Sequence, residues 1–499
     1  MKKQWQIRAL TALLLLAMLV SCGKTEDGGE TKSGTDTENT TESIENAETE
    51  SETEETGEKP DLPSDLSFDG KSFTFGVINN KNARNLIVPE ELTGEALNDA
   101  QYNTIQQTNE ALNVKIGQNI LTSNYPAAQD VITLVMAGDD VVQVANVYCA
   151  DVPNLLTGGY VMSYRDVPYI DLEKPWWDKK VNDTLVVSDI RYAVNGDLNI
   201  TTHDLTYVLV FSKDQIIDNS LENPYDLVNS GTWTMDKMSE MMITVTNDRD
   251  GNGEWNARDS YGYTSAIKMT LPSFWIGAGE TAVALDENNI PTLSMGSERF
   301  YDVIQKIFAI TYDTGVRFRN EDNSDVPTDG IQLFQNDRAL FMDCSLFYMT
   351  ALRDMEADFG IIPYPKFDEA QENYCARVSY FMPSMLLSTN TDLPLVGAVL
   401  EYANYRAQAN ITPAYYDVSL KGKVSRDEES AAMLDLILAN RVVDLADTIF
   451  CADMRDSFFS AMYGTDVRDM ASVMKANEKT LTKMLNAFVE NSIAAIDKK

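Results

Sequence analysis

Oxygen-bearing groups recur at regular positions between residues 248 and 259. The segment reads DRDGNGEWNARD, with oxygens at its first, third, fifth, seventh, ninth and twelfth positions and Gly253 at the sixth. Calcium prefers several hard oxygen ligands, and a glycine at the sixth position permits the sharp turn that brings them together. The spacing predicts a structural Ca²⁺ held by Asp248, Asp250, Asn252, the backbone carbonyl of Glu254, and Asp259.

This loop departs from an EF-hand in two ways. Asp259 stands where the motif has Glu, and its shorter side chain would weaken calcium binding or admit Mg²⁺. A helical pattern, WTMDKMSEMM, precedes the loop, but SYGYTSAI after it has the pattern of a strand. The expected role is a stabilising clip rather than a switch, and the alternative is an acidic surface turn without metal.

Residues for nucleophilic catalysis are scarce. The chain has one histidine, His203, beside Asp204, and no G-x-S-x-G elbow accompanies it. A single histidine also excludes His-rich metal sites. Acidic residues are abundant, so a glycoside hydrolase that uses paired carboxylates stays open as an alternative function.

The N-terminus has the features of a bacterial lipoprotein signal. The basic segment MKKQWQIR precedes the apolar run ALTALLLLAMLVS, which is shorter than the ~20 residues that span a bilayer. Leu19-Val20-Ser21-Cys22 resembles a lipobox, in which the cysteine is lipidated and the preceding bond is cut. We expect a signal peptide over 1–21 and a protein held outside the cytoplasm by palmitate and related acyl chains on Cys22.

Residues 22–63 follow as an acidic segment with few large apolar side chains, which predicts a disordered tether between the lipid and the folded part. The whole chain has a formal net charge of −37, which disfavours nucleic acid and anionic lipid surfaces as partners. The remaining cysteines show no C-x-x-C pairing, and their disulfide state stays open; they are Cys149, Cys344, Cys375 and Cys451.

Helical and strand patterns alternate along the folded part, which predicts an α/β protein with parallel strands covered on both faces. In KSFTFGVI, Phe73, Phe75 and Val77 share one face. Further strands are expected at 113–117, 141–148, 207–211 and 339–342. Helices are expected at 98–112, 127–136, 233–246, 298–314 and 394–406, with one apolar stripe on two helices after Asp466. The length favours two lobes.

Four stretches, in this order, resemble the extracellular solute-binding proteins of family 1, the receptor subunits of ABC importers for sugars and oligosaccharides. They are DAQYNTIQQTNEALNVKIG, AVNGDLNITTHDLTYVLVFSKDQI, NPYDLVNSGTWTMDKMSEMM and FQNDRALFMDCSLFYMTALRDMEADFGIIPYPK. The resemblance covers most of residues 66–499. Ser212-Lys213-Asp214 departs from the family's usual Asn-Lys-Asp.

The resemblance implies a two-lobe, periplasmic-binding-protein-like (type II) Venus flytrap that the chain crosses three times. The implied lobes are 64–194 with 384–415, and 195–383 with 416–499. The implied function is capture of a carbohydrate between the lobes and delivery to ABC permease subunits, without catalysis, by a monomer.

A carbohydrate cleft needs aromatic platforms beside hydrogen-bonding groups. Tyr148 and Asp151 follow a predicted strand at its carboxyl end, where open α/β sheets bind ligands. Phe274 and Trp275 stand where the resemblance implies cleft aromatics, and for Trp177 packing at the lobe junction is the alternative. The remaining candidates are Asp197, Asp204, Ser345 and Tyr348.

Overall fold

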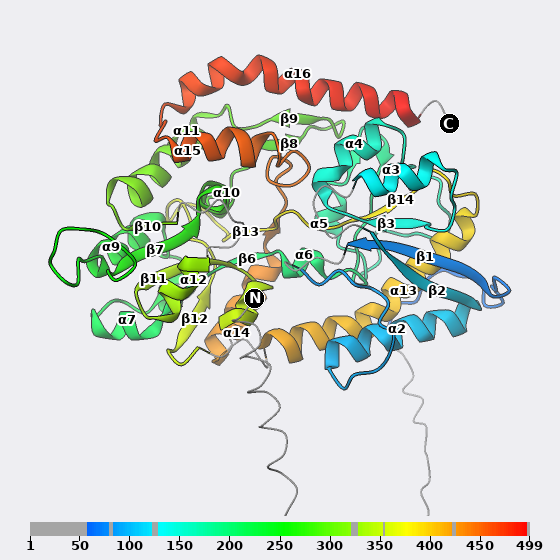
Figure 1. Cartoon of the computed structure of the whole chain (residues 1–499), viewed down its shortest axis with the longest axis horizontal. Helices are drawn as coiled ribbons and strands as arrows, with labels where there is room; N and C mark the ends of the chain where they lie inside the picture. Colours follow the sequence, from blue (N-terminus) through cyan, green and yellow to red (C-terminus); the bar gives the residue numbers. More distant parts are fainter. Residues whose placement is uncertain are drawn as a thin grey trace, which may run out of the picture. The chain divides into compact units, whose positions relative to one another are not determined.

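Two β-sheets organise the part of the chain that the structure, a computed structural model, describes (Figure 1). The described residues are 57–78, 83–121, 128–320, 328–352, 355–421 and 426–496. The predicted signal peptide, Cys22 and most of the predicted tether lie outside them. The chain from Glu58 onward forms one unit. We call the four-stranded sheet with its helices the first lobe and the five-stranded sheet with its helices the second lobe.

The sheet of the first lobe has the strand order β14-β3-β1-β2. Its strands are β1 (Lys71–Ile78), β2 (Val114–Leu121), β3 (Val144–Asn146) and β14 (Ser384–Leu386). β1 pairs in parallel with β2 and β3, and β14 is antiparallel to β3. Phe73, Phe75 and Val77 are fully buried on one face, as their alternation predicted.

Helices cover both faces of this sheet. On the side of Phe73 and Phe75, α2 (Ala96–Leu112) packs against α13 (Leu393–Pro413). On the other side lie α3 (Ala128–Met136) and α4 (Val152–Thr157), whose apolar residues join a second cluster. Buried apolar faces on both sides of a largely parallel sheet explain the run of apolar residues in these strands.

The sheet of the second lobe has the order β10-β7-β11-β6-β12. Its strands are β6 (Tyr207–Ser212), β7 (Tyr261–Ala266), β10 (Arg317–Asn320), β11 (Ala339–Ser345) and β12 (Phe359–Ile362). β7 is parallel to β10 and β11, whereas β6 is antiparallel to β11 and β12. Successive residues of β6 enter different apolar clusters, so this sheet is also buried on both faces.

The short helices α5 (Lys179–Asn182) and α6 (Thr201–Asp204) precede β6, and the remaining helices follow it. They are α7 (Lys213–Asp218), α8 (Pro224–Asn229), α9 (Met235–Val245), α10 (Ile267–Gly277), α11 (Glu298–Phe308), α12 (Thr328–Gln335), α14 (Glu428–Ala439), α15 (Ser460–Gly464) and α16 (Met470–Ile496). Thr234 caps the N-terminus of α9, and its side chain accepts a hydrogen bond from the amide of Lys237 at 3.3 Å. This N-cap satisfies an amide that the helix leaves unpaired.

Within the described residues the chain passes between the lobes three times. The first crossing is the segment 195–206, which contains α6 (Thr201–Asp204); the second joins β13 (Ala376–Arg377) to β14; the third joins α13 to α14. The first two crossings lie side by side, because Thr206 bridges Val378 and Val194 bridges Ser384. They form a paired hinge strip between the sheets.

Further contacts tie the lobes together away from this strip. β8 (Val283–Leu285) and β9 (Pro291–Leu293) form a hairpin whose turn contains Asn289. The carbonyl of Asn289 accepts a hydrogen bond from the amide of Ser188 at 3.0 Å. Ser188 lies in the turn between β4 (Val186–Val187) and β5 (Ile190–Arg191). α16 contacts α11 and β9 and also reaches α4 of the first lobe (Figure 1).

Two sequence expectations differ from the structure. The tail after Asp466 is one continuous helix, α16, instead of two, because no breaker interrupts the stripe of Met470, Met474, Leu481, Leu485 and Phe488. The helix expected over 298–314 is α11 followed by a π-helical turn over Ala309–Asp313. In the part of the chain described, the cysteines are unpaired, and no helix is both long and apolar enough to span a bilayer.

Candidate functional site

A cavity of about 110 Å³ lies where residues of both lobes and of the second crossing meet. Its lining residues are Tyr148, Ala150, Lys268, Tyr380, Cys451, Arg455 and Asp456. Tyr148 and Ala150 follow β3 of the first lobe, Tyr380 belongs to the second crossing, and Lys268 lies in the first turn of α10. The cavity therefore combines aromatic rings with groups of both charges.

Tyr148 and Tyr380 lie together because β14 is antiparallel to β3. The residues that follow β3 thus meet the residues that precede β14. The amide of Cys149 donates to the carbonyl of Phe381 at 2.9 Å, which holds the two segments side by side. The ring centroids of Tyr148 and Tyr380 are 5.8 Å apart with a tilt of 43°. The two residues are 6% and 7% exposed, so they form a nearly enclosed aromatic wall.

Arg455 forms the floor beside this wall. It lies in a π-helical segment, Met454–Phe459, with its guanidinium carbon 5.2 Å from the ring centroid of Tyr380. Its Nε and Nη2 donate to the two carboxylate oxygens of Asp456 at 2.7 and 3.0 Å. Burial alone would raise the pKa of Asp456, but Arg455 and then Lys268 lower it below its usual value. The carboxylate is therefore ionised and held by a fork of two hydrogen bonds.

A fully buried ion network supports Arg455 from below. Arg377 of β13 donates from Nε and Nη2 to both oxygens of Asp447, at 2.7 and 2.8 Å. Arg455 reaches the same carboxylate, with Nη1 3.4 Å from Oδ1. Arg377 and Asp447 are completely buried. Asp447 thus contacts both guanidinium groups and, together with Asp456, balances their charge and positions the floor of the cavity.

Lys268 brings a second cation to the cavity. Burial lowers the pKa of Lys268 from its usual value, while the charge of Asp456 opposes that shift. Cations, a carboxylate and tyrosine rings around one small space provide both apolar faces and hydrogen-bonding groups, which is the combination that a polyhydroxylated ligand requires.

The predicted residues Tyr348 and Asp151 do not line this cavity. Burial raises the pKa of Tyr348, and the charges of Cys344 and Tyr148 add to the shift. The amide of Asp151 donates to the carbonyl of Tyr148 at 2.8 Å, and its side chain is buried. Of the predicted ligand residues, Tyr148 lines the cavity directly.

The two predicted aspartates of the first crossing have other surroundings. Asp204 is fully buried, forms an ion pair with Arg84, and accepts hydrogen bonds from the amide of Arg84 at 2.7 Å and the hydroxyl of Tyr415 at 3.0 Å. Burial, followed by the charge of Asp178, raises the pKa of Asp197 to about 7. Asp204 thus links the first crossing to Arg84 and Tyr415, and both aspartates lie outside the cavity lining.

The other predicted residues are enclosed in the protein core. Trp177 and its neighbour Trp176 donate through Nε1 to the buried carboxylate of Glu401, at 2.9 and 3.2 Å. Phe274 and Trp275 are completely buried, and Trp275 donates to Asp444 at 2.8 Å. In this structure these rings offer no surface to a ligand. From Met269 to Gly277 the residues of α10 are all buried, so the sequence of this part of the helix does not mark which side meets a cleft. Ser345, at the end of β11, is buried too.

Tyr380, Lys268 and Arg455 were not among the predicted residues. The antiparallel entry of β14 beside β3 is the one signal that links Tyr380 to Tyr148, and it requires a strand pairing that the sequence does not display. Arg455 reaches the cavity through a π-helical segment and Lys268 through the turn after β7. Both depend on contacts between distant parts of the chain.

The candidate metal loop joins α9 to β7 as expected. Gly251 and Gly253 have φ of +68° and +78°, which residues with a Cβ rarely adopt. Asp248 accepts hydrogen bonds from the amides of Gly251 and Gly253 at 2.8 and 2.7 Å, and these bonds lower its pKa, the bond from Gly253 most. Asp259 is fully buried beneath the loop.

The loop gathers carboxylates at one point. Asp248, Asp250 and Asp259 each offer an oxygen, and these oxygens lie within 4.8 Å of one another. Asn252 Oδ1 accepts the amide of Glu254 at 2.6 Å, which brings both residues to the same turn. Mutual repulsion of three clustered carboxylates is relieved by a cation, so the donor set fits a hard divalent ion.

No protein-family model matches the chain, and no curated protein is similar to it. Solved structures do match. One is an ABC substrate-binding protein from Listeria monocytogenes in complex with cycloalternan (TM-score 0.55, 12% identity, 84% of this chain and 100% of that chain). Another is a cyclic alpha-maltosyl-1,6-maltose binding protein from Arthrobacter globiformis (0.54, 11%, 86% and 99%). A third is a solute-binding protein from Thermotoga lettingae bound with alpha-D-tagatose (0.53, 13%, 83% and 100%).

The chain has the fold of the periplasmic-binding-protein-like substrate-binding proteins. The predicted two-lobe α/β architecture is thus confirmed. In a binding-protein fold the lobes close on each other by rotation at the crossings. Tyr380 lies on one of these crossings and Tyr148 contacts it, so a hinge rotation changes the distance between walls of this cavity.

Proposed function

We propose that the protein is the receptor subunit of an ABC importer, which captures a sugar or oligosaccharide between its lobes and delivers it to membrane permease subunits. One observation carries the proposal. The tyrosine pair, Lys268 and the Arg455–Asp456 fork surround a cavity at the lobe junction, in a fold shared with proteins named for bound carbohydrates.

The size of the cavity favours a receptor that opens to bind. A volume of about 110 Å³ is well below the roughly 300–1,000 Å³ of common small-molecule sites. A sugar therefore enters when the lobes are further apart and gains contacts to both lobes on closure. It shifts the population toward the closed state by this difference in affinity.

The lining of the cavity argues against a glycoside hydrolase. That chemistry uses two carboxylates flanking the scissile bond, roughly 5–10 Å apart. Among the described lining residues the carboxylate is Asp456, and both of its oxygens accept hydrogen bonds from Arg455. A carboxylate held in this way is suited to binding a hydroxyl rather than to transferring a proton.

The proposal includes the membrane attachment that the sequence predicts. A lipid on Cys22, which lies outside the described residues, would hold the monomeric receptor at the outer face of the cell membrane, and the acidic tether would let the lobes reach the permease. The basic segment, apolar run and lipobox of the N-terminus support this part.

A ligand screen by thermal shift tests the function. Maltose, cycloalternan, tagatose and longer oligosaccharides are added to the protein, and the mixtures are analysed for products. We expect at least one carbohydrate to raise the melting temperature without turnover. Tyr380→Ala should then weaken its binding by about tenfold or more, because one face of the aromatic wall is lost. Tyr102→Ala, on α2 away from the cavity, is the matched control. Sugar turnover, or equal affinity in both variants, would contradict the proposal.

We further propose that the loop from Asp248 to Asp259 holds a structural Ca²⁺. Asp248, Asp250, Asn252 and Asp259 would supply side-chain oxygens and Glu254 its carbonyl; Mg²⁺ is the competing ion. The convergence of three carboxylates and the positive φ of Gly251 and Gly253 support this assignment. The ion would fasten the end of α9 to the start of β7 and so stabilise the second lobe.

Calcium at a hundred times its Kd should stabilise the protein by about 3 kcal/mol. We expect a chelator to lower the melting temperature by several degrees and excess calcium to restore it, with sugar specificity unchanged. Asp250→Ala should abolish this response. Asp286→Ala, in another exposed turn, should keep it. A chelator without effect on the wild type would rule the site out.

A further inference from the structure

Two hairpin turns from different lobes meet at the surface of the protein. One turn joins β4 to β5, before the first crossing, and contains Ser188; the other joins β8 to β9 of the second lobe and contains Asn289. The amide of Ser188 donates to the carbonyl of Asn289 at 3.0 Å, and Nδ2 of Asn289 donates to the carbonyl of Ser188 at 3.1 Å. We call these two reciprocal hydrogen bonds between the lobes the latch.

Both residues of the latch have a backbone conformation that favours glycine. The angle φ is +54° at Ser188 and +58° at Asn289. Asparagine tolerates this region better than most residues do. Ser188 is the first of two residues in its hairpin loop, and glycine is the usual residue where that position has a positive φ. Strain of this kind persists where surrounding contacts hold it, and the latch provides such contacts.

Each turn is fixed in its own lobe. The amide of Tyr164 donates to the carbonyl of Arg191 at 2.8 Å, which holds the first hairpin. At the base of the second hairpin, the buried carboxylate of Asp444 accepts the amide of Ala282 at 2.7 Å. Hydrogen bonds are largely lost beyond about 3.5 Å. A rotation that moves the two turns apart by about 1 Å therefore breaks the latch.

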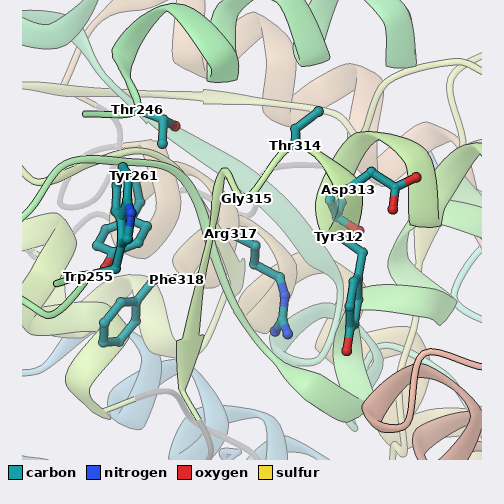
Figure 2. A pocket seen from close by; sticks show the side chains of 10 residues that line it. Thr246, Trp255, Tyr261, Tyr312, Asp313, Thr314, Gly315, Arg317 and Phe318 are labelled. Carbon is teal, nitrogen blue, oxygen red and sulfur yellow. The ribbon is translucent and has the colours of Figure 1, made fainter. Parts of the chain in front are cut away.

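The lobes that the latch joins enclose a cavity well below the usual size of a ligand site. Cys451 of the second lobe lines this cavity opposite Tyr148 and Ala150 of the first lobe, and it is 3% exposed. The larger cavity of about 450 Å³ has lining residues from the second lobe alone, among them Trp255 and Tyr312 (Figure 2). A rotation between the lobes does not change its size. Separation of the lobes is therefore detected at Cys451.

We propose that the latch holds the empty lobes together and so opposes the entry of a ligand until it breaks. The effect on sugar binding rests on the proposed function, whereas the effect on lobe separation does not. When the open state is a minor fraction, the apparent affinity for a ligand is reduced in proportion to that fraction. Breaking the latch should raise the open fraction and the apparent affinity by the same factor.

Variants of the second turn test the latch. In Asn289→Asp a carboxylate, which cannot donate, faces the carbonyl of Ser188. Asn289→Gly removes the same donor and keeps the positive φ. Asn288→Asp is the matched control, because it adds the same charge to the neighbouring exposed residue. Ser188→Gly should keep the latch, because Ser188 contributes its amide and carbonyl to it.

Alkylation of Cys451 by iodoacetamide in the ligand-free protein, followed by peptide mass spectrometry, measures separation of the lobes. We expect Asn289→Asp and Asn289→Gly to raise the rate about fivefold, the effect of losing one hydrogen bond. Asn288→Asp and Ser188→Gly should not raise it. Cys344, which is 4% exposed and lies outside the cavity lining, reports unfolding. Equal rates at Cys451 in Asn289→Asp and Asn288→Asp, or an equal rise at Cys344, would overturn the proposal.

Sugar titrations separate this inference from the proposed function. Maltose, cycloalternan and tagatose are titrated into both charge variants, and the sugar that binds should bind about fivefold more tightly to Asn289→Asp than to Asn288→Asp. Weaker binding by Asn289→Asp would refute the opposing role of the latch. Faster alkylation of Cys451 in a protein that binds none of these sugars would support the latch and count against the proposed function alone.

Discussion

Replacing Asp447 by alanine is expected to lower the free energy of unfolding by about 3–5 kcal/mol, because the change leaves the buried charge of Arg377 without its carboxylate partner. Asp447 accepts two hydrogen bonds from Arg377 and lies 3.4 Å from Arg455, and Arg377 is completely buried. Arg377 cannot reach water without displacing core residues, whereas Arg455 lines the cavity and keeps its bonds to Asp456. The loss should be a large part of the total stability of the protein.

Urea denaturation followed by circular dichroism measures this loss, and the melting temperature should fall by roughly ten degrees. Asp189→Ala is the matched control, because it removes a carboxylate from the exposed ion pair with Arg165 and should cost less than about 1 kcal/mol. Asp447→Asn keeps hydrogen-bond acceptance without the charge and should lie between the two. Equal effects of Asp447→Ala and Asp189→Ala would contradict the network's structural role.

Stability is also expected to fall as the pH rises from about 4.5 to 8. Glu401 is fully buried, and burial raises its pKa to about 7 although Trp177 and Trp176 donate to it. Below its unfolded pKa near 4.5 the group is protonated in both states. Between 4.5 and 7 it ionises on unfolding but stays protonated in the folded protein. The contribution lost across this window is on the order of 3 kcal/mol.

Two other carboxyl groups act in the same direction. Burial raises the pKa of Asp197 to about 7 and that of Asp444 to about 6. Urea denaturation at pH 5 and pH 8 should therefore find the protein more stable at pH 5. Glu401→Gln should reduce the difference between the two pH values, whereas Glu173→Gln, at an exposed position, should leave it unchanged. Identical pH profiles for wild type and Glu401→Gln would exclude this assignment.

The elements whose apolar residues recur with a regular period were predictable from the sequence. β1 buries Phe73, Phe75 and Val77 as its alternation indicates, and α2 and α9 occupy the segments that their periodicity marks. These patterns are local, so the neighbouring residues in the sequence contain the information. The turn of the candidate metal loop is also local, since Gly251 and Gly253 have positive φ, and metal binding there stays a prediction.

The candidate ligand site was predictable in part. Tyr148 follows the carboxyl end of a strand, which is where open α/β sheets bind ligands, and it lines the cavity. Phe274 and Trp275 have the residue types of a platform, but α10 is enclosed and they serve the core. The residue type alone does not show whether an aromatic ring is buried in the core or available to a ligand. That distinction depends on the packing of neighbouring elements, and so does the pairing of Tyr148 with Tyr380.

α16 restricts how the two lobes can move. It is 27 residues long, about 40 Å, and it touches α11 and β9 at one part of its length and α4 at another. The three crossings connect the two lobes, and the contacts of α16 connect them a second time. A rotation of the lobes about the axis of α16 preserves the apolar contacts of this helix. A larger separation of the lobes breaks the contacts between α16 and α4. The contacts of α16 with both lobes therefore favour one direction of rotation, and the extent of that rotation limits the size of the molecule that fits between the lobes.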